Sequence, residues 1–255
     1  MSAKKYYEQI SGVLAAIDES QAEKLRQAGE AFADAIAAGD RVYLFGSGHS
    51  VIPVMDIFPR YGSFVGFFPL YDPRLMWHNV VGPGGARELL WLERREGYIE
   101  QFLQSYAFEP GDWIIIFSHG GLNAAGIEAA LYAKERGVKV VSVSSHANAS
   151  VAKATHSTGK KLSEVADIAI DNCVAPEDSQ VEVGRPEKVA AGSTMAAVFI
   201  AMALVAETGA RLVARGFEPH TFVSPNVAGI EKDHNFQVFD RFTEKLFERT
   251  PRRNA

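Results

Sequence analysis

The sequence predicts a single α/β domain built around a sheet that is at least partly parallel. Its clearest strand candidate, WIIIF at 113–117, is apolar throughout, as expected of a strand covered on both faces. A helical segment and a second strand candidate follow it, and this strand, helix, strand order is typical of parallel pairing. With 255 residues, 47% of them hydrophobic, the chain can bury a sizeable core. No repeat, low-complexity stretch or linker divides residues 1–255 into separate domains.

The N-terminal segment, residues 1–39, is expected to be helical. Tyr6, Ile10 and Val13 begin an apolar repeat at spacings of three and four, and the same period returns after a candidate cap at 18–20. Gly39 then follows as a C-terminal stop. Because both helical segments precede the first strand, we expect them to pack outside the sheet, at a contact with a second subunit.

The sheet core is expected within residues 40–216, followed by a C-terminal extension at 217–255. In chain order the strand candidates are 41–45, 63–68, 113–117, 139–144 and 166–170, of which the second has the weakest pattern. The helix candidates are 88–106, 123–136, 193–215 and 232–248. Residues 69–87 are rich in Gly and Pro, and a loop of this length inside a compact domain usually has a function.

Composition argues against several classes of function. The chain carries 26 Lys and Arg against 31 Asp and Glu, a net charge of -5, whereas a general nucleic-acid binder needs a basic face. No apolar run reaches the roughly 18 residues of a membrane-spanning helix, and residues 1–8 lack the pattern of a signal peptide. Cys173 is the only cysteine, so no internal disulfide can form. We therefore expect a cytoplasmic protein without nucleic-acid or membrane partners.

Two loops that follow strand candidates have the composition of ligand-binding loops. In open parallel sheets, ligands bind beyond the carboxyl ends of the strands. Glycines let the backbone approach a ligand closely, hydroxyls donate hydrogen bonds, and a helix N-terminus favours an anion. Asn123 alone could instead cap the helix that follows it. The residues of the two loops are Gly46, Ser47, Gly48, His49 and Ser50, and then Ser118, His119, Gly120, Gly121 and Asn123.

Neither loop completes a familiar nucleotide-binding or hydrolase motif. No Gly-Lys-Ser/Thr follows the glycines, which excludes a Walker A loop. The third glycine of a dinucleotide fingerprint would fall at Val51 and is missing. The Gly-x-Ser-x-Gly elbow of the α/β-hydrolases is also absent from the sequence.

At these residues the chain resembles the sugar isomerase (SIS) domain family. The matching segments are YLFGSGHS at 43–50, IIIFSHGGLNAAGIEAALYAKERGVKVVSVSS at 114–145, ADIAIDN at 166–172, and the Ser193-Thr194 pair that opens a long helix. More narrowly, the chain is similar to a phosphoheptose-isomerase-like branch of that family. The further matches are Glu96-Gly97-Tyr98, STGKKL at 157–162, FVSPNVAG at 222–229 and His234-Asn235, which extend the resemblance over most of the chain.

The resemblance implies a three-layer fold, with a flavodoxin-like parallel sheet between helices. It implies a homodimer or homotetramer whose N-terminal helices and active sites lie at subunit contacts. It also implies a small-molecule partner, a phosphorylated sugar. Ser47, Ser118, Ser193 and Thr194 match the family's anchors for the anion.

The second loop departs from the family pattern at two positions. Gly120 stands where these loops usually carry a second Ser, and Leu122 stands where the branch often has Arg. Charge-assisted hydrogen bonds contribute about 1.5–3 kcal/mol each, so the loss of a hydroxyl and a cation is substantial. A sulfonated or uncharged sugar is therefore an alternative to a sugar phosphate.

Aldose–ketose isomerisation moves a proton between adjacent carbons through an enediol, and it needs a base and an acid. His49 and His119 lie in the two loops, and imidazole titrates near neutrality. His234 lies in a segment matched to the branch. The carboxylate candidates are Glu96, at another matched position, and Glu182, in the region where SIS isomerases tend to place an acid–base residue. His78 and His220 are further candidates.

Together these features predict an isomerase that interconverts an aldose and a ketose, acting on a phosphorylated or sulfonated sugar. One alternative is a lyase or deglycase that uses the same enolisation on a sugar phosphate. Another is a non-catalytic regulator that binds sugar phosphates, but such regulators usually carry a helix-turn-helix domain, and residues 1–39 lack a basic recognition helix. No cofactor or metal is expected, because no His-x-x-x-His or Cys pair has ligand spacing.

Overall fold

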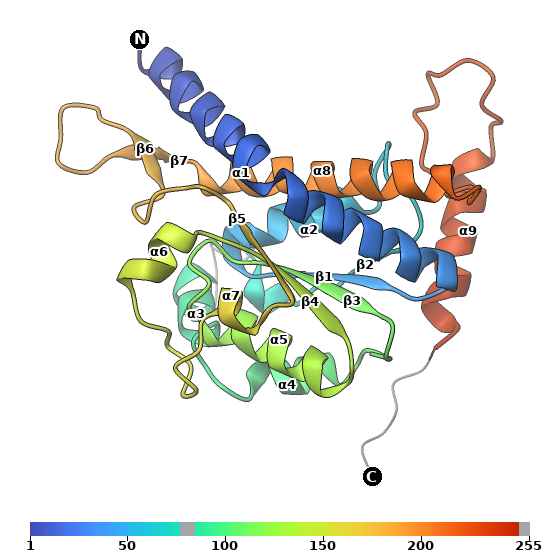
Figure 1. The fold of residues 1–255 in the computed structure, drawn as a ribbon, viewed down its shortest axis with the longest axis horizontal. Helices are drawn as coiled ribbons and strands as arrows, with labels where there is room; N and C mark the ends of the chain where they lie inside the picture. The colour runs from blue at the N-terminus through green and yellow to red at the C-terminus, as the bar shows by residue number, and fades with distance from the viewer. Residues whose placement is uncertain (77–84, 250–255) are drawn as a thin grey trace.

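The computed structural model describes residues 1–76 and 85–249 and centres on a five-stranded sheet in the order β2-β1-β3-β4-β5 (Figure 1). Every neighbouring pair in this sheet is parallel. This is the flavodoxin-like order: β2 is added on one side of β1, and β3, β4 and β5 are added on the other, so the strand order reverses between β1 and β3. The strands are β1 (Val42–Gly46), β2 (Phe67–Pro69), β3 (Trp113–Phe117), β4 (Lys139–Ser144) and β5 (Ile168–Asp171).

The apolar runs of β1 and β3 arise because both faces of the sheet are covered. In β1, Val42 and Leu44 pack into one core cluster, whereas Tyr43 and Phe45 pack into the other. This division follows the alternation of side chains along a strand. All residues of both strands are buried, so neither strand shows the apolar–polar alternation of a half-exposed sheet.

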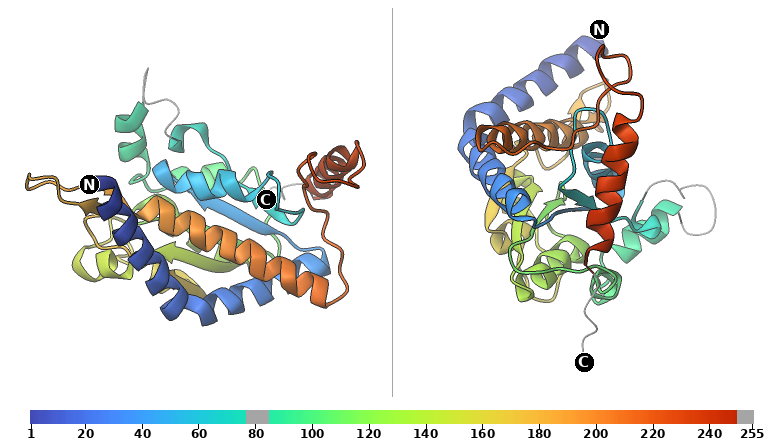
Figure 2. Two further views of the ribbon diagram at one scale, coloured as in Figure 1. Left: turned by 90° about the horizontal axis from the view of Figure 1, so that it is seen from above. Right: turned by 90° about the vertical axis from the view of Figure 1, so that its right-hand side faces the viewer.

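Two layers of helices enclose the sheet (Figures 1 and 2). On one face lie α1 (Ser2–Ala38), α2 (Val51–Ile57) and α8 (Ser193–Ala214). On the other face lie α3 (Gly85–Leu92), α4 (Tyr98–Leu103), α5 (Ala124–Glu135) and α7 (Leu162–Val165). The short segments η1 (Gly48–Ser50), η2 (Pro73–Leu75) and α6 (His146–Val151) lie in the connections. The predicted α/β fold with a flavodoxin-like parallel sheet is confirmed.

Helix α8 is long and apolar enough to cross a membrane by length and composition alone, so the expectation that no apolar run reaches this length was wrong. In the structure it packs along α1 and contributes Ala196, Ile200 and Leu204 to the core cluster beneath that helix. Its apolar character therefore has an explanation in the packing of this fold.

Several elements differ from the sequence-based expectation, and the strand predicted at 63–68 is shorter, forming only β2 (Phe67–Pro69). Helix α1 runs without a break, where two segments were predicted. The predicted helix 88–106 is two helices, α3 and α4, separated by a turn in which Gly97 has a φ of 83°. An antiparallel hairpin of β6 (Ser179–Val181) and β7 (Val189–Ala191) was not predicted, because its strands are short and β7 is exposed throughout.

Helix α9 (His234–Phe247) lies at the end of the sheet where β1 and β3 begin (Figure 1). A side-chain nitrogen of Arg41, which precedes β1, donates to the carbonyl oxygen of Lys245. Arg249, just after α9, donates to both carboxylate oxygens of Asp112, which precedes β3. The C-terminal helix is thus anchored at the opposite end of the strands from the two predicted ligand loops.

Candidate functional site

The two predicted loops lie side by side at the point where the strand order reverses. Strands β1 and β3 are adjacent, and Gly46 at the end of β1 is the register partner of Phe117 at the end of β3. The chain therefore leaves the sheet at Ser47 and at Ser118 on the same side, at the carboxyl ends of β1 and β3. Ligands of sheets with this strand order bind just outside this point, so the carboxyl ends of β1 and β3 are the candidate site.

The turn after β1 requires a glycine at its start. A Cβ atom added to Gly46 would lie 2.2 Å from the carbonyl oxygen of Ser50, a separation that no side chain tolerates. The N–H of Ser50 donates to the carbonyl oxygen of Ser47 (3.1 Å), which closes the turn. Ser50 itself is buried, whereas Ser47 and His49 are only partly buried at the edge of the sheet.

Glu93 is the carboxylate closest to this turn, although the sequence did not single it out. The hydroxyl of Ser47 donates to Oε2 of Glu93 (3.0 Å), and Glu93 is only 8% exposed. Its carbonyl oxygen accepts a hydrogen bond from the N–H of Ala125 in the first turn of α5. Burial raises the pKa of Glu93, while the hydrogen bond from Ser47 and the charge of Arg94 oppose that rise. Buried carboxyl groups of this kind are suited to proton transfer near neutral pH.

The loop after β3 is closed by Ser118 and leads into α5. The N–H of Gly121, whose φ is 62°, donates to the hydroxyl oxygen of Ser118 (3.2 Å). Asn123 is the N-cap residue of α5, but its side chain makes no capping hydrogen bond. The N-terminus of this 12-residue helix faces the loop with a partial positive charge, which favours an anion at this point.

His119 is held in place by the ends of β4 and β5. Its carbonyl oxygen accepts from the N–H of Ser145 (2.8 Å), and its Nδ1 lies 3.3 Å from Nδ2 of Asn172. Oδ1 of Asn172 accepts from the N–H of Val174 (3.1 Å), so Nδ2 is the donor to the ring and we assign the ring proton to Nε2. That Nε2 is buried.

His49, Ser193 and Asp178 form a chain of hydrogen bonds. Nε2 of His49 lies 3.2 Å from the hydroxyl of Ser193, and this hydroxyl donates to Oδ2 of Asp178 (2.8 Å). Because the hydroxyl has one proton, it accepts from Nε2–H of His49, and Nδ1 of His49 is then unprotonated. The backbone N–H groups of Gly192 and Ser193 donate to Oδ1 of Asp178 (3.1 and 2.7 Å). Asp178 thus caps α8 and orients His49 through Ser193.

Burial and nearby hydrogen bonds and charges shift the pKa values of His49, His119 and Asp178. Burial lowers the pKa of His49 and that of His119, while the nearby charge of Asp178 opposes the change in both, so both rings are neutral at pH 7. Burial alone would raise the pKa of Asp178, but hydrogen bonds from Ser193 hold it below its usual value. Asp178 also has a φ of 62°, in the left-handed region that residues other than glycine rarely adopt, and such strain often accompanies functional sites.

Three of the predicted acid–base residues lie apart from this cluster within one chain. Glu96 is exposed, and its carboxylate accepts from the N–H and the hydroxyl of Ser157 (2.7 and 2.6 Å). Glu182 is exposed just after β6. Nε2 of His234 lies 2.8 Å from the carbonyl oxygen of Thr221, at the start of α9 and away from the two loops.

Of the other predicted residues, some lie in the cluster and some do not. Ser193 joins the cluster, but its hydroxyl is bonded to Asp178, so an anion placed there would meet a carboxylate. Thr194 follows it in the first turn of α8 and is partly buried. His78 lies outside the described residues. Within residues 1–76 and 85–249, no group of three or more His, Cys, Asp or Glu could hold a metal ion.

Comparison with known proteins identifies relatives along most of the chain. Residues 5–145 match the family model described as the SIS domain. A UPF0309 protein of Oceanobacillus iheyensis is 33% identical, over 95% of this chain and 97% of the relative. A UPF0309 protein of Caldanaerobacter subterraneus subsp. tengcongensis is 32% identical, over 94% of this chain and 97% of the relative. The family resemblance inferred from the sequence is confirmed.

Solved structures share the fold at low sequence identity. A phosphoheptose isomerase from Francisella tularensis superposes with a TM-score of 0.53 at 13% identity, covering 81% of this chain and 95% of the other. The phosphoheptose isomerase of Neisseria gonorrhoeae gives 0.52 at 13% identity, covering 82% and 97%. At 13% identity, these likenesses show a shared fold alone. The expected homodimer or homotetramer stays a prediction.

Proposed function

The chain belongs to the SIS domain family, and we propose that it is an aldose–ketose isomerase for a sugar that carries a phosphate or sulfonate group. The observation that carries this proposal is the buried carboxyl of Glu93, hydrogen-bonded to Ser47 beside the two loops. Isomerisation needs a base next to the site that holds the sugar, and Glu93 supplies one. Proteins with the same fold are named phosphoheptose isomerases, which is consistent with this class of reaction.

The proposed reaction transfers a proton between adjacent carbons without net oxidation. The carboxylate of Glu93 removes the proton from the carbon beside the carbonyl group, and the electron pair of that C–H bond forms the enediol double bond. A neutral imidazole donates a proton to the carbonyl oxygen. Glu93 then returns its proton to the former carbonyl carbon, and the other hydroxyl gives its proton back to the imidazole. His49 and His119 are the candidate donors, and Nε2–H of His49 is bonded to Ser193.

The anionic group of the substrate is expected at Ser118 and the start of α5, because the hydroxyl of Ser47 already donates to the carboxylate of Glu93. The cluster formed by the two loops, Glu93, Asp178 and Ser193 contains no Lys or Arg. Hydroxyls, backbone N–H groups and the partial charge of α5 must then supply the attraction. This donor set suits a singly charged sulfonate at least as well as a doubly charged phosphate.

Incubation in D₂O tests the proposed activity directly. Phosphorylated, sulfonated and uncharged aldoses are each mixed with the protein and followed by NMR. An isomerase forms the matching ketose with deuterium at C1, and aldose that is re-formed from this ketose carries deuterium at C2. A lyase or deglycase instead releases the substituent at C3 or an amine, and a regulator binds a sugar without exchange. Either of these results, or no exchange with any sugar, would contradict the proposal.

The activity is expected to increase from acid to neutral pH. The pKa of Glu93 is raised above 4.5, so the carboxylate needed as base becomes protonated as the pH falls toward that range. The pKa values of His49 and His119 are lowered below 6.5, so their neutral forms are lost at still more acidic pH than usual. Both changes reduce the activity as the pH falls. Measured kcat/KM that decreases from acid to neutral pH would contradict these assignments.

A further inference from the structure

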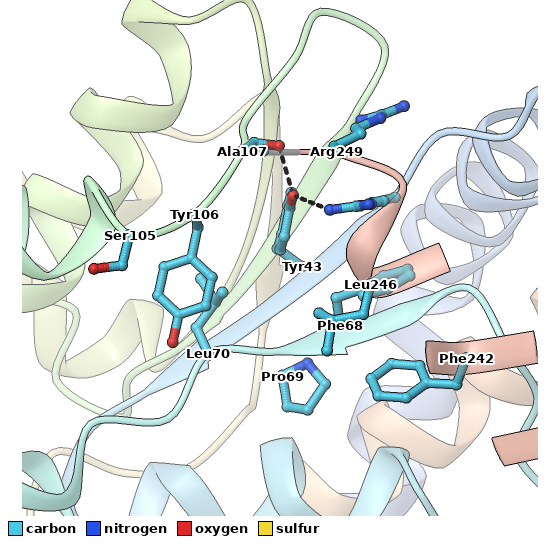
Figure 3. A pocket seen from close by; sticks show the side chains of 11 residues that line it. Tyr43, Phe68, Pro69, Leu70, Ser105, Tyr106, Ala107, Phe242, Leu246 and Arg249 are labelled. Carbon is cyan, nitrogen blue, oxygen red and sulfur yellow. Dashed lines mark hydrogen bonds between the residues drawn. The ribbon is translucent and has the colours of Figure 1, made fainter. Parts of the chain in front are cut away.

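A second candidate binding site lies at the opposite end of the sheet, where β1 and β3 begin. A cavity of about 80 Å³ opens there between β1, the end of β2, the segment after α4, and α9. Figure 3 shows the aromatic rings of Tyr43, Tyr106 and Phe242 around this space, with Arg249 at its upper edge. Arg41 also lines the cavity. Because Ser47 and Ser118 leave the other end of these strands, the cavity is separate from the candidate active site.

Arg41 places a buried positive charge at the cavity wall. The residue is 3% exposed. One terminal nitrogen donates to the carbonyl oxygen of Lys245, the other lies 3.4 Å from the hydroxyl of Tyr43, and the guanidinium lies 4.9 Å from the ring centroid of Phe68. Nε is buried and has no hydrogen-bond partner in the described part of the chain. A guanidinium has five N–H donors, so part of its capacity is unused.

The neighbouring cations are already paired, in contrast to Arg41. The guanidinium of Arg249 contacts Asp40, Glu109 and Asp112. Lys245 pairs with Glu248 (2.9 Å). Within residues 1–76 and 85–249, no carboxylate forms an ion pair with Arg41. A buried charge without a counter-ion is costly, so an anion that reaches Arg41 would gain a strong interaction.

We propose that this cavity binds a small organic carboxylate, with the carboxylate against Arg41 and a short apolar chain between Phe68, Phe242 and Leu246. The walls away from the guanidinium are mostly apolar, which disfavours an inorganic anion that needs hydrogen bonds on every side. An apolar cavity of about 150 Å³ holds benzene, so this cavity suits a carboxylate of roughly two to four carbons. Nothing in the isomerase reaction requires such a site, and the binding is independent of it.

Calorimetric titration of the full chain with acetate, propionate and butyrate tests the proposal, with inorganic phosphate as the comparison anion. We expect one site per chain, with propionate or butyrate bound more tightly than phosphate. The Arg41→Gln variant should bind at least tenfold more weakly, because the charge is lost. Ser47→Ala, at the other end of β1, should bind the carboxylate with unchanged affinity.

A second variant separates ligand binding from stability, since Arg41 also bonds to α9. Leu246 is 41% exposed at the rim of the cavity, and Leu246→Trp fills the space while leaving Arg41 in place. We expect this variant to lose carboxylate binding and to keep its unfolding midpoint. Absence of carboxylate binding to the unsubstituted chain would overturn the proposal. So would equal affinities in all variants, tighter binding of phosphate, or loss of binding only in Ser47→Ala.

Discussion

Replacement of Glu93 by Gln is expected to lower kcat/KM for isomerisation by about 10²–10⁴-fold. Gln has nearly the same volume, and its side-chain oxygen can still accept the hydrogen bond from Ser47. The amide cannot take a proton, however, and the site is buried enough that bulk water does not replace the carboxylate. Initial rates of deuterium incorporation and of ketose formation, measured with the sugar found in the D₂O experiment, provide the test.

Glu96→Gln and Glu182→Gln are the matched controls for this prediction. Both carboxylates are exposed, and neither touches the two loops, so both variants should retain rates close to that of the unsubstituted protein. Glu93→Asp should recover part of the rate lost in Glu93→Gln, because a shorter carboxylate is still a base. A large loss in Glu96→Gln, with normal rates in Glu93→Gln, would transfer the role of base to Glu96.

The parts of the fold that the sequence predicted well are those with a local cause. Strands β3 and β4 have the predicted bounds, because β3 is wholly apolar, β4 is rich in Val, and each starts after a turn with Gly111 or Gly137. The hairpin β6–β7 was missed for the opposite reason. β6 has a single apolar residue, Val181, and β7 is exposed, so no apolar pattern marks the hairpin.

The candidate site was predicted in its two loops and in Ser193, but Glu93 and Asp178 were missed. The two glycine- and serine-rich loops could be recognised, because their position after apolar strands fixes where they lie. The contact between His49 and Ser193 joins residues 144 positions apart, and no local pattern reports it. Glu93 did leave a signal: it lies four residues after buried Leu89, which puts a carboxylate on the apolar face of a helix.

Replacement of Asp112 by Asn is expected to destabilise the fold by about 3–5 kcal/mol. Asp112 is 0% exposed, and its Oδ1 accepts from the backbone N–H of Arg41 (2.8 Å) and from Nη1 of Arg249 (2.8 Å). Its Oδ2 accepts from the N–H of Glu109 (2.9 Å). Burial raises the pKa of Asp112, and these hydrogen bonds oppose the rise. In Asn, one of the two oxygens becomes an NH₂ group that faces a buried donor, and Arg249 loses its most buried counter-ion.

Thermal unfolding measures this effect, with an expected decrease in Tm of about 6–20 °C. Asp56→Asn is the control, because it removes an exposed ion pair with Arg60 and should change stability by less than about 1 kcal/mol. Asp112 precedes β3 and binds the backbone just before β1, so it joins the two strands whose far ends carry Ser47 and Ser118. If Asp112→Asn is no less stable than Asp56→Asn, the hydrogen bonds between β1 and β3 are sufficient to hold the two loops together.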